Sequence, residues 1–418
     1  MRTDRFLAQV CMVAAASCAS APYGLAADVE FNPTVDFNVF YDGNTRGVGE
    51  DAPPPQEPPP DPPTDPTSTD DPSAIVGGIG VTLPWTVRTP STTFAVSYRP
   101  RREIYGDEER PDFTSHALET SVGRTVSPRA SYSVAARYDR TDRQELDPRR
   151  PPDELVDPRT YTLRRTFESG GLSGSGSFSA GRSSSLDWRV GVRWERGEDL
   201  PESPYQDSEA YNAGFGWAHD YSPQGSAGIG LLVQHFTYEA SETFPDVDVV
   251  SLGHTGTRRF SRDGSLIYAV GALRSDNGGV TNTAGSVNVT ANWVLGPRSS
   301  ITAGVRQGAS AGDGTSGATL DRGGYASWSY TAPRGFSASV AATYWDRRNL
   351  NDPSAASALP AAFTFSDALS WRVGRFFRIG VFHTFHSQSS DEAALETNYH
   401  SAGLHGSWIV RGERRAGA

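Results

Sequence analysis

Apolar and polar side chains alternate along many segments of this chain, and the clearest case is Leu186–Glu195. Its apolar members are Leu186, Trp188, Val190, Val192 and Trp194, and its other members are Asp187, Arg189, Gly191, Arg193 and Glu195. Successive side chains of a β-strand point to opposite faces, so the segment predicts a strand with one apolar and one charged face. Trp188 and Trp194 would lie about 20 Å apart at about 3.3 Å per residue. That distance approaches the height of a lipid-facing band with aromatic residues at both rims.

The same alternation predicts strands elsewhere in the chain. It recurs at Val29–Asp42 with Phe40 as an exception, and at Phe94–Arg99, Tyr132–Asp139, Val287–Leu295, Phe336–Tyr344, Phe377–His386 and His400–Val410. In the expected strand Ala227–Glu239 the alternation slips between Val233 and Phe236, which predicts a β-bulge. The pattern is weakest in the expected strand Arg159–Phe167.

Eight short turn signals separate these strands in pairs, and longer polar loops separate the pairs. The turns are Arg88–Ser91, Ser127–Arg129, Gly181–Ser184, Ser222–Gly225, Ser261–Gly264, Gly296–Ser299, Ala332–Gly335 and Gly374–Arg375. Pro, Gly and Ser suit tight turns, and short turns on one side with long loops on the other are typical of outer-membrane barrels. One opening strand, eight hairpins and one closing strand give 18 strands, or 16 if one weak hairpin is merged. An even number lets the first and last strands pair antiparallel.

We therefore predict an all-β fold, a transmembrane antiparallel β-barrel over residues 27–418. The short turns and both chain ends would be periplasmic, and the long loops external. Residues 1–26 have two arginines, an apolar stretch and Gly24-Leu25-Ala26, as in a secretory signal peptide. Cys11 and Cys18 both fall in this segment, so the mature chain would have no disulfide. Residues 50–72 are Pro-rich and acidic, which predicts a disordered external loop.

Composition supports a barrel over other classes. The chain has 37% hydrophobic residues and a mean hydropathy of −0.47. Beyond the N-terminal segment it has no run of the about 20 apolar residues that a spanning helix needs, whereas barrel strands are only half apolar. The net charge of −11 includes seven acidic residues in Glu50–Pro72. Every basic residue is Arg, and no basic patch or motif predicts binding to nucleic acid.

No arrangement of residues predicts catalysis, a metal site or a cofactor. His383 and His386 lie three apart and would point to opposite faces of their strand. His400 cannot activate Ser401, because adjacent strand residues also point apart. These histidines are expected to be ordinary polar residues of the lumen or of the membrane interface.

The alternation instead predicts two sets of positions with a role in a barrel. The lumen-facing, solute-facing candidates are Arg99, Arg137, Asp187, Arg189, Arg193, Glu195, Arg306, Arg372 and Arg378. The expected aromatic residues of the lipid rims are Trp188, Trp194, Trp293, Tyr344 and Trp408. Rows of Arg and carboxylate could set the field for passing solutes, or could simply be hydrated and pair with one another.

Several short motifs resemble the outer-membrane β-barrel porins encoded beside exopolysaccharide-export genes, a group similar to β-barrel porin-2. They are the opening strand with Pro33 and Tyr41-Asp42-Gly43-Asn44, the hairpin His116–Tyr138 with its Ser127-Pro128-Arg129 turn, and the closing His400-Ser401-Ala402-Gly403-Leu404. The Pro-rich acidic segment departs from that pattern. The resemblance implies a barrel in a Gram-negative outer membrane and a polysaccharide conduit as one use, and it supplies no catalytic residues.

Three functions follow as hypotheses. The first is a polar channel for hydrophilic solutes, such as a small solute or an exported polysaccharide. The second is a closed structural or adhesive surface barrel that acts through its external loops. The third is a membrane-embedded lipid hydrolase at His400 and Ser401. The sequence leaves the oligomeric state open.

Overall fold

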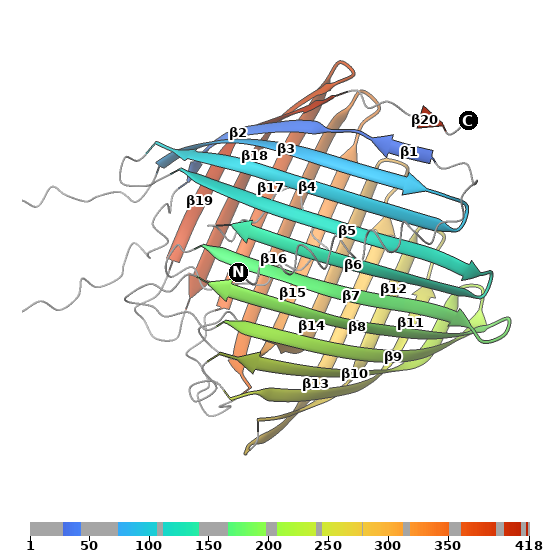
Figure 1. The fold of residues 1–418 in the computed structure, drawn as a ribbon. Helices are drawn as coiled ribbons and strands as arrows, with labels where there is room; N and C mark the ends of the chain where they lie inside the picture. The colour runs from blue at the N-terminus through green and yellow to red at the C-terminus, as the bar shows by residue number, and fades with distance from the viewer. Residues whose placement is uncertain are drawn as a thin grey trace, which may run out of the picture.

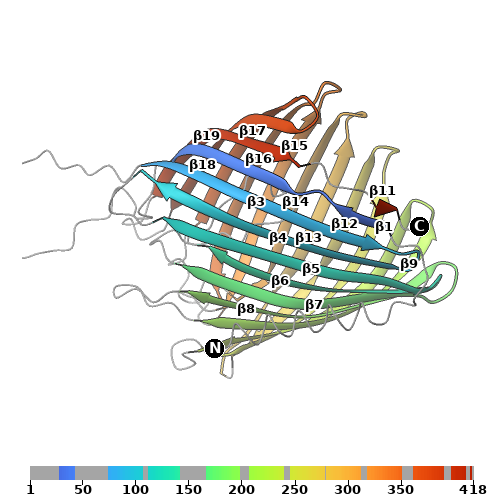
Figure 2. The same cartoon turned by 45° about the horizontal axis from the view of Figure 1, so that its top comes forward.

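The chain forms one closed antiparallel β-barrel (Figures 1 and 2). The computed structural model describes residues 28–42, 74–106, 112–141, 166–197, 207–239, 245–277, 279–311, 318–350, 361–389, 397–410 and 415–416. The expected signal peptide and Pro-rich loop lie outside these residues. No helix in the described part of the chain is long and apolar enough to cross a membrane.

The strands follow one another around the barrel in chain order. They are β1 (Asp28–Phe31), β2 (Thr34–Asp42), β3 (Ala74–Arg88), β4 (Thr92–Tyr105), β5 (Phe113–Ser127), β6 (Ala130–Thr141), β7 (Phe167–Ser179), β8 (Ser184–Gly197), β9 (Ser208–Ser222), β10 (Gly225–Tyr238), β11 (Val247–Arg259), β12 (Gly264–Asp276), β13 (Thr281–Val294), β14 (Ser299–Ser310), β15 (Thr319–Thr331), β16 (Phe336–Asn349), β17 (Ala361–Val373), β18 (Phe377–Ser389), β19 (Thr397–Ile409) and β20 (Arg415–Ala416).

The barrel closes where β19 pairs antiparallel with β2, from Ile409↔Thr34 to Ser401↔Asp42. β1 and β2 are one strand interrupted at Pro33, which has no N–H to donate to a ladder, and both halves pair with β3. This opening strand and the 17 strands β3 to β19 give 18. The prediction of 18 strands is confirmed, and the alternative of 16 is wrong. The short β20 pairs with β1 beside the ring.

Eight connections of two to four residues lie together at one end of the barrel, here called the short-turn end (Figure 1). They occupy the positions of the eight turn signals. Four of them contain a glycine with positive φ: Gly181, Gly296, Gly335 and Gly374. Such a conformation is costly for residues with a Cβ, so glycine favours these turns. The connections at the opposite end, here called the long-loop end, are mostly longer, with Asn277–Val280 as a short exception.

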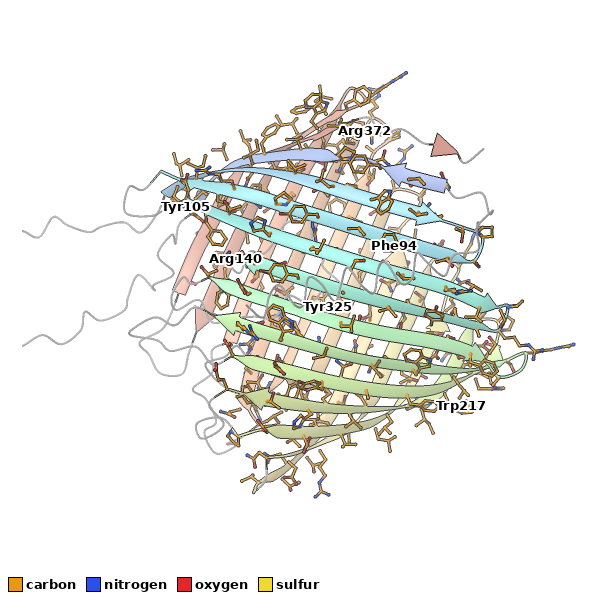
Figure 3. The ribbon with its side chains drawn as sticks, in the orientation of Figure 1. Phe94, Tyr105, Arg140, Trp217, Tyr325 and Arg372 are labelled. Atoms are coloured by element: carbon orange, nitrogen blue, oxygen red, sulfur yellow. The ribbon has the colours of Figure 1, made fainter. Side chains whose placement is uncertain are left out.

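The outer face of the barrel carries a belt of exposed apolar side chains. On β8 it contains Leu186, Trp188, Val190, Val192 and Trp194, as the alternation predicts, and the neighbouring strands continue it with residues such as Phe215, Leu231 and Leu252. Figure 3 shows Trp217 on this face near the short-turn end. So wide a contiguous apolar surface is not what a protein surrounded by water presents.

Glycines of β7 accommodate the tryptophans of β8 on this outer face. A Cβ on Gly170 would lie 2.4 Å from the Trp194 ring, and one on Gly176 would lie 2.5 Å from Trp188. The rings therefore lie across the backbone of β7 because that strand has no side chains there. Residues 159–165 of the expected strand Arg159–Phe167 lie outside the described residues. β7 begins at Phe167 and continues through a Gly- and Ser-rich segment with little β-propensity.

The predicted bulge between Val233 and Phe236 is wrong. β10 keeps one register with β9 from Ser226 to Tyr238, and the only shift lies at Gly225/Ser226. Phe236 and Tyr238 point into the barrel like Gln234, and both are buried. The apolar pattern changes there because the inner wall itself becomes apolar, not because the strand slips. Phe40 is an interior exception of the same kind and packs with Val76 and Tyr105.

Candidate functional site: the barrel interior

The interior holds a cavity of about 1750 Å³, lined by residues of β2 to β15. Most of the inward side chains on its wall are small or polar: Asp36, Thr82, Ser97, Ser115, Ser121, Ser169, Ser173, Asn212, Thr255, Asn288, Thr290 and Asn292. The small side chains leave space along the axis, and the polar ones can hydrogen-bond to water or to a hydrated solute.

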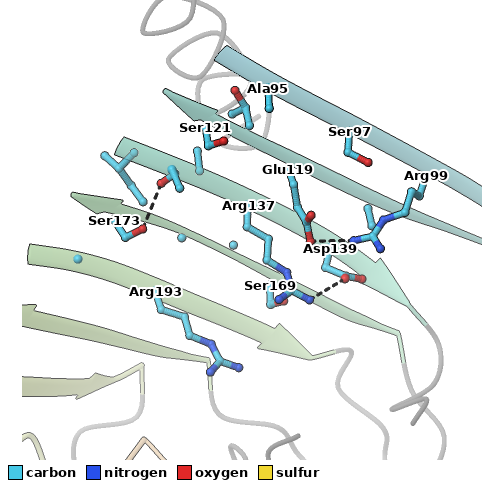
Figure 4. Close-up of a pocket in the computed structure, with 18 of the residues that line it drawn as sticks. Ala95, Ser97, Arg99, Glu119, Ser121, Arg137, Asp139, Ser169, Ser173 and Arg193 are labelled. Atoms are coloured by element: carbon cyan, nitrogen blue, oxygen red, sulfur yellow. Dashed lines mark hydrogen bonds and ion pairs between the residues drawn. The ribbon is translucent and has the colours of Figure 1, made fainter. Parts of the chain in front are cut away.

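Arginine–carboxylate pairs follow the wall from β4 to β8 towards the long-loop end (Figure 4). The Nη2 atom of Arg99 lies 2.7 Å from Oε1 of Glu119, across two strands. The other pairs join residues two apart on one strand: Arg101–Glu103 at 3.1 Å, Arg137–Asp139 at 3.3 Å and Arg193–Glu195 at 3.2 Å. The partly exposed pairs Arg99–Glu119 and Arg137–Asp139 contribute little to stability, whereas Glu103 and Glu195 are buried beside their arginines. All four pairs fix the positions of charges along one wall.

The cavity is lined by charges of both signs. Five arginines contribute, Arg99, Arg101, Arg137, Arg193 and Arg306. Five carboxylates oppose them, Asp36, Glu119, Asp139, Asp187 and Asp220. Glu103 and Glu195 add two buried carboxylates beside Arg101 and Arg193. The wall therefore presents local fields of both signs rather than a single-sign potential.

The nine lumen candidates from the sequence all lie on the interior face by strand register. Arg99, Arg137, Asp187, Arg193 and Arg306 line the cavity. Glu195 is buried at 6% exposure beside Arg193. Arg189 lies on the same face of β8, close to Gly214 of β9. Arg372 and Arg378 are direct cross-strand neighbours at the short-turn end, away from the other seven.

The five aromatic rim candidates lie on the outer face. Trp188, Trp293 and Trp408 lie towards the short-turn end, and Trp194 and Tyr344 towards the long-loop end. Trp194 is the least exposed of them, because it contacts Tyr138 and lies beneath the guanidinium of Arg196, 5.4 Å from its ring centroid. They occupy two levels, one near each end of the belt.

Part of the barrel bends into the lumen at the long-loop end. β13 and β14 pair only as far as Val287↔Gln307, although β13 continues to Thr281 and stays paired with β12. Beyond that point β14 pairs with β15 alone, whereas β15 also pairs with β16, as far as Asn349. We call the upper ends of these three strands, residues 308–311, 318–322 and 346–350, the flap.

The flap packs against the inner wall of β10 to β12. Its members Ala309, Ala318 and Leu350 join one buried apolar cluster with wall residues Phe236, Tyr238, Val247, Val249 and Leu273. Two hydrogen bonds hold it across the lumen. The Tyr238 hydroxyl donates to the carbonyl of Ala311 at 2.8 Å, and the Asn282 amide donates to the carbonyl of Leu350 at 2.9 Å.

A polar group inside the flap ties its strands together. Thr319, Asp321 and Arg347 are all buried, at 0%, 7% and 3% exposure. The Thr319 hydroxyl donates to Asp321 at 2.6 Å, and Nε of Arg347 lies 3.7 Å from the same carboxylate oxygen. A buried carboxylate and guanidinium that face each other resist separation, since either would be left as an unpaired buried charge.

The flap makes the cavity asymmetric. On β11 to β13 the lining reaches only to Thr255, Ala269 and Asn288, whereas on β4 to β7 it extends to Arg101, Thr141 and Phe167. At the long-loop end the open part of the lumen therefore lies against the wall that carries the ion pairs.

Sequence reasoning missed the flap and the pairing partners Glu119, Arg101 and Glu103. The signal for the flap in the sequence was the pair of exceptions to the alternation, at Phe40 and at Phe236. An apolar side chain that faces the lumen must be covered by other residues. Among the described residues, no group of three or more His, Cys, Asp or Glu side chains is arranged to hold a metal ion.

No protein-family model matches the chain, and no curated protein matches it in sequence. Several solved structures are similar in fold. OccK2 (OpdF) of Pseudomonas aeruginosa in complex with glucuronate is 13% identical, with a TM-score of 0.46 and coverage of 93% of this chain and 100% of that one. OprD of the same organism is 12% identical, with a TM-score of 0.43 and coverage of 94% and 97%. The siderophore receptor PirA, also from P. aeruginosa, is 9% identical, with a TM-score of 0.41 and coverage of 90% and 80%. Similarities of this size concern the fold and leave the solute and the partners open.

Proposed function

We propose that this chain forms a channel for hydrophilic solutes in a Gram-negative outer membrane. The observation that carries the proposal is the contrast between the two faces of one closed sheet. The outer face is an apolar belt with aromatic residues towards both ends, suited to lipid. The inner face encloses a cavity of about 1750 Å³ whose wall carries mostly small and polar side chains and charges of both signs.

The mixture of positive and negative charges along the wall favours neutral or zwitterionic solutes over simple ions of either sign. Alternating guanidinium and carboxylate groups can hydrogen-bond to the hydroxyl groups of a sugar without attracting one sign of charge. We therefore expect small saccharides and similar polar molecules to be the solutes. Export of an exopolysaccharide is a narrower form of the same proposal, and it requires a continuous path past the flap for an extended chain.

Planar-bilayer recording tests the channel. The refolded chain should give ion conductance with a reversal potential near zero under a salt gradient, and added sugars should reduce the current. A series of oligosaccharides of increasing length tests the narrower form, since a conduit would admit long chains end-on. A folded barrel without conductance would contradict the channel and favour the closed surface barrel, in which the flap fills the lumen.

A further inference from the structure

A chain of three polar side chains lies on the outer face, within the apolar belt. Nδ1 of His383 on β18 lies 3.1 Å from Oδ1 of Asp367 on β17, and its Nε2 lies 3.2 Å from Nδ1 of His400 on β19. The ring of Phe385 packs on His400, with centroids 4.8 Å apart. We call Asp367, His383 and His400 the outer patch.

The outer patch lies in the middle of the lipid-facing surface, where charged side chains are rare. Asp367 is the middle residue of β17, and its outward neighbours on that strand are Phe365 and Leu369. Among the described strands, the other outward carboxylates, such as Glu168, Glu209, Asp248 and Asp346, lie within four residues of a strand end at the long-loop end. The Asp367 side chain is 42% exposed in a single chain, so lipid tails would contact a carboxylate. Such a position indicates a function or a partner.

We propose that the outer patch is the centre of a contact between two copies of this chain, side by side in the membrane. This inference rests on the proposed membrane location. Two copies inserted in the same direction are related by a twofold axis along the membrane normal. A twofold contact brings the same surface of each copy together. If the axis passes near His383, the β17 side of one copy faces the β19 side of the other.

Under this symmetry, the outer patch of one copy can offer hydrogen-bond donors to acceptors in the outer patch of the other copy. When Nδ1 of His383 donates to Asp367, Nε2 of His383 accepts from Nδ1 of His400. One carboxylate oxygen is then left at the β17 side and Nε2 of His400 at the β19 side. With one further proton on each imidazole pair, Nε2 of His400 donates to Asp367 of the second copy. Two such bonds link the two outer patches in a closed ring. The two added protons balance the charges of the two carboxylates, and the contact between the copies keeps these groups away from lipid.

Cross-linking in vesicles of phosphatidylethanolamine and phosphatidylglycerol tests the contact. The parent chain carries Cys11→Ser and Cys18→Ser, so that only introduced thiols react. Val381, the outward residue next to His383 on β18, is changed to Cys, and the matched control is Val270→Cys in the belt of β12. We expect a disulfide-linked dimer for Val381→Cys and at least tenfold less for Val270→Cys.

The dependence on the patch is tested by adding Asp367→Asn to the Val381→Cys chain. We expect the dimer fraction to fall at least tenfold, whereas His254→Gln, which changes an outward histidine of β11, should leave it unchanged.

Three outcomes would each overturn the proposal. They are a wild-type chain that stays monomeric, a dimer fraction that Asp367→Asn does not change, and a monomer with a phospholipid bound at the outer patch. Heat-modifiable migration in gels confirms folding, and the Val381→Cys result alone remains decisive if Asp367→Asn fails to fold. Conductance separates the two proposals, because a monomer that conducts contradicts only the dimer.

Discussion

Arg99 and Glu119 show how a single pair of side chains can set a property of the whole lumen. Their charged atoms lie 2.7 Å apart on the wall that faces the open part of the lumen. Each group compensates the charge of the other, so changing either one leaves an uncompensated charge in the cavity. Ion selectivity is therefore more sensitive to these residues than stability is.

Glu119→Gln should shift the channel towards anions, and Arg99→Gln should shift it towards cations. The first change leaves an uncompensated guanidinium in the lumen, and the second leaves a carboxylate. The reversal potential under a potassium chloride gradient measures both shifts. Arg124→Gln, on the outer face of β5, serves as the control and should cause no shift. Equal reversal potentials for all three variants would contradict the assignment of the ion-pair wall to the conducting path.

A second residue-scale prediction concerns the fit between β7 and β8. Gly176→Ala places a methyl group where the Trp188 ring lies, 2.5 Å from Nε1, so the ring must move. Overpacking of this kind costs about 1–3 kcal/mol. The urea midpoint of the barrel in liposomes, followed by tryptophan fluorescence, should fall. Gly77→Ala on β3 adds the same methyl group with no atom within 4 Å and should leave the midpoint unchanged.

Among the elements, the flap departs most from a regular barrel. Its strands leave β13 and fold against the inner wall, where Leu273 is 1% exposed. The apolar cluster and the Tyr238 and Asn282 hydrogen bonds anchor it there. Weakening the anchor should therefore change how much of the lumen is open without removing any strand of the ring.

Leu273→Ala should raise the single-channel conductance and make the current noisier. A buried Leu→Ala change removes about 2–5 kcal/mol of packing, here from the contact between the flap and the wall. Leu252→Ala is the control, since Leu252 lies on the outer face of β11 with 58% exposure. If Leu273→Ala lowered the thermal stability but left the conductance unchanged, the flap would not be what narrows the channel.

Whether an element could be predicted from the sequence depended on whether the residues that determine it lie close together in the chain. β8 and the eight turns followed from alternation and turn chemistry, because both are local. The range of β7 did not follow from alternation, because its glycines are explained only by Trp188 and Trp194 on another strand. The flap was missed because Tyr238 and Ala311 meet across the lumen, 73 residues apart in sequence. The outer patch combines three strands, although the outward parity of Asp367, His383 and His400 was readable in the sequence.

For the whole molecule, closure of the ring between β2 and β19 joins residues near the two ends of the described chain. Closing a sheet removes its edges, which would otherwise be unpaired in lipid. Val39 and Leu404 are direct partners across this seam and both point outward. They provide a simple test of closure in the membrane.

Val39→Cys with Leu404→Cys should form an intramolecular disulfide in the folded barrel, because direct cross-strand partners have Cβ atoms about 4.5–5.5 Å apart. Mobility in non-reducing gels reports the bond. Val35→Cys with Leu404→Cys displaces one thiol by four residues along β2 and should cross-link poorly. Equal cross-linking of the two pairs would mean that the seam has another register or is open.

The departure of β14 from β13 gives this closed sheet a local edge. Residues Thr281–Ser286 pair with β12 alone, and the Gln307 side chain donates to the carbonyl of Gly285 at 2.8 Å where ladder bonds would otherwise continue. Opening a barrel costs least where fewest interstrand bonds must break. Unfolding should therefore begin at this site, and hydrogen exchange should reach the β14-facing amides of Thr281–Ser286 before those of β8. The bend that narrows the lumen thus also determines where the barrel first comes apart.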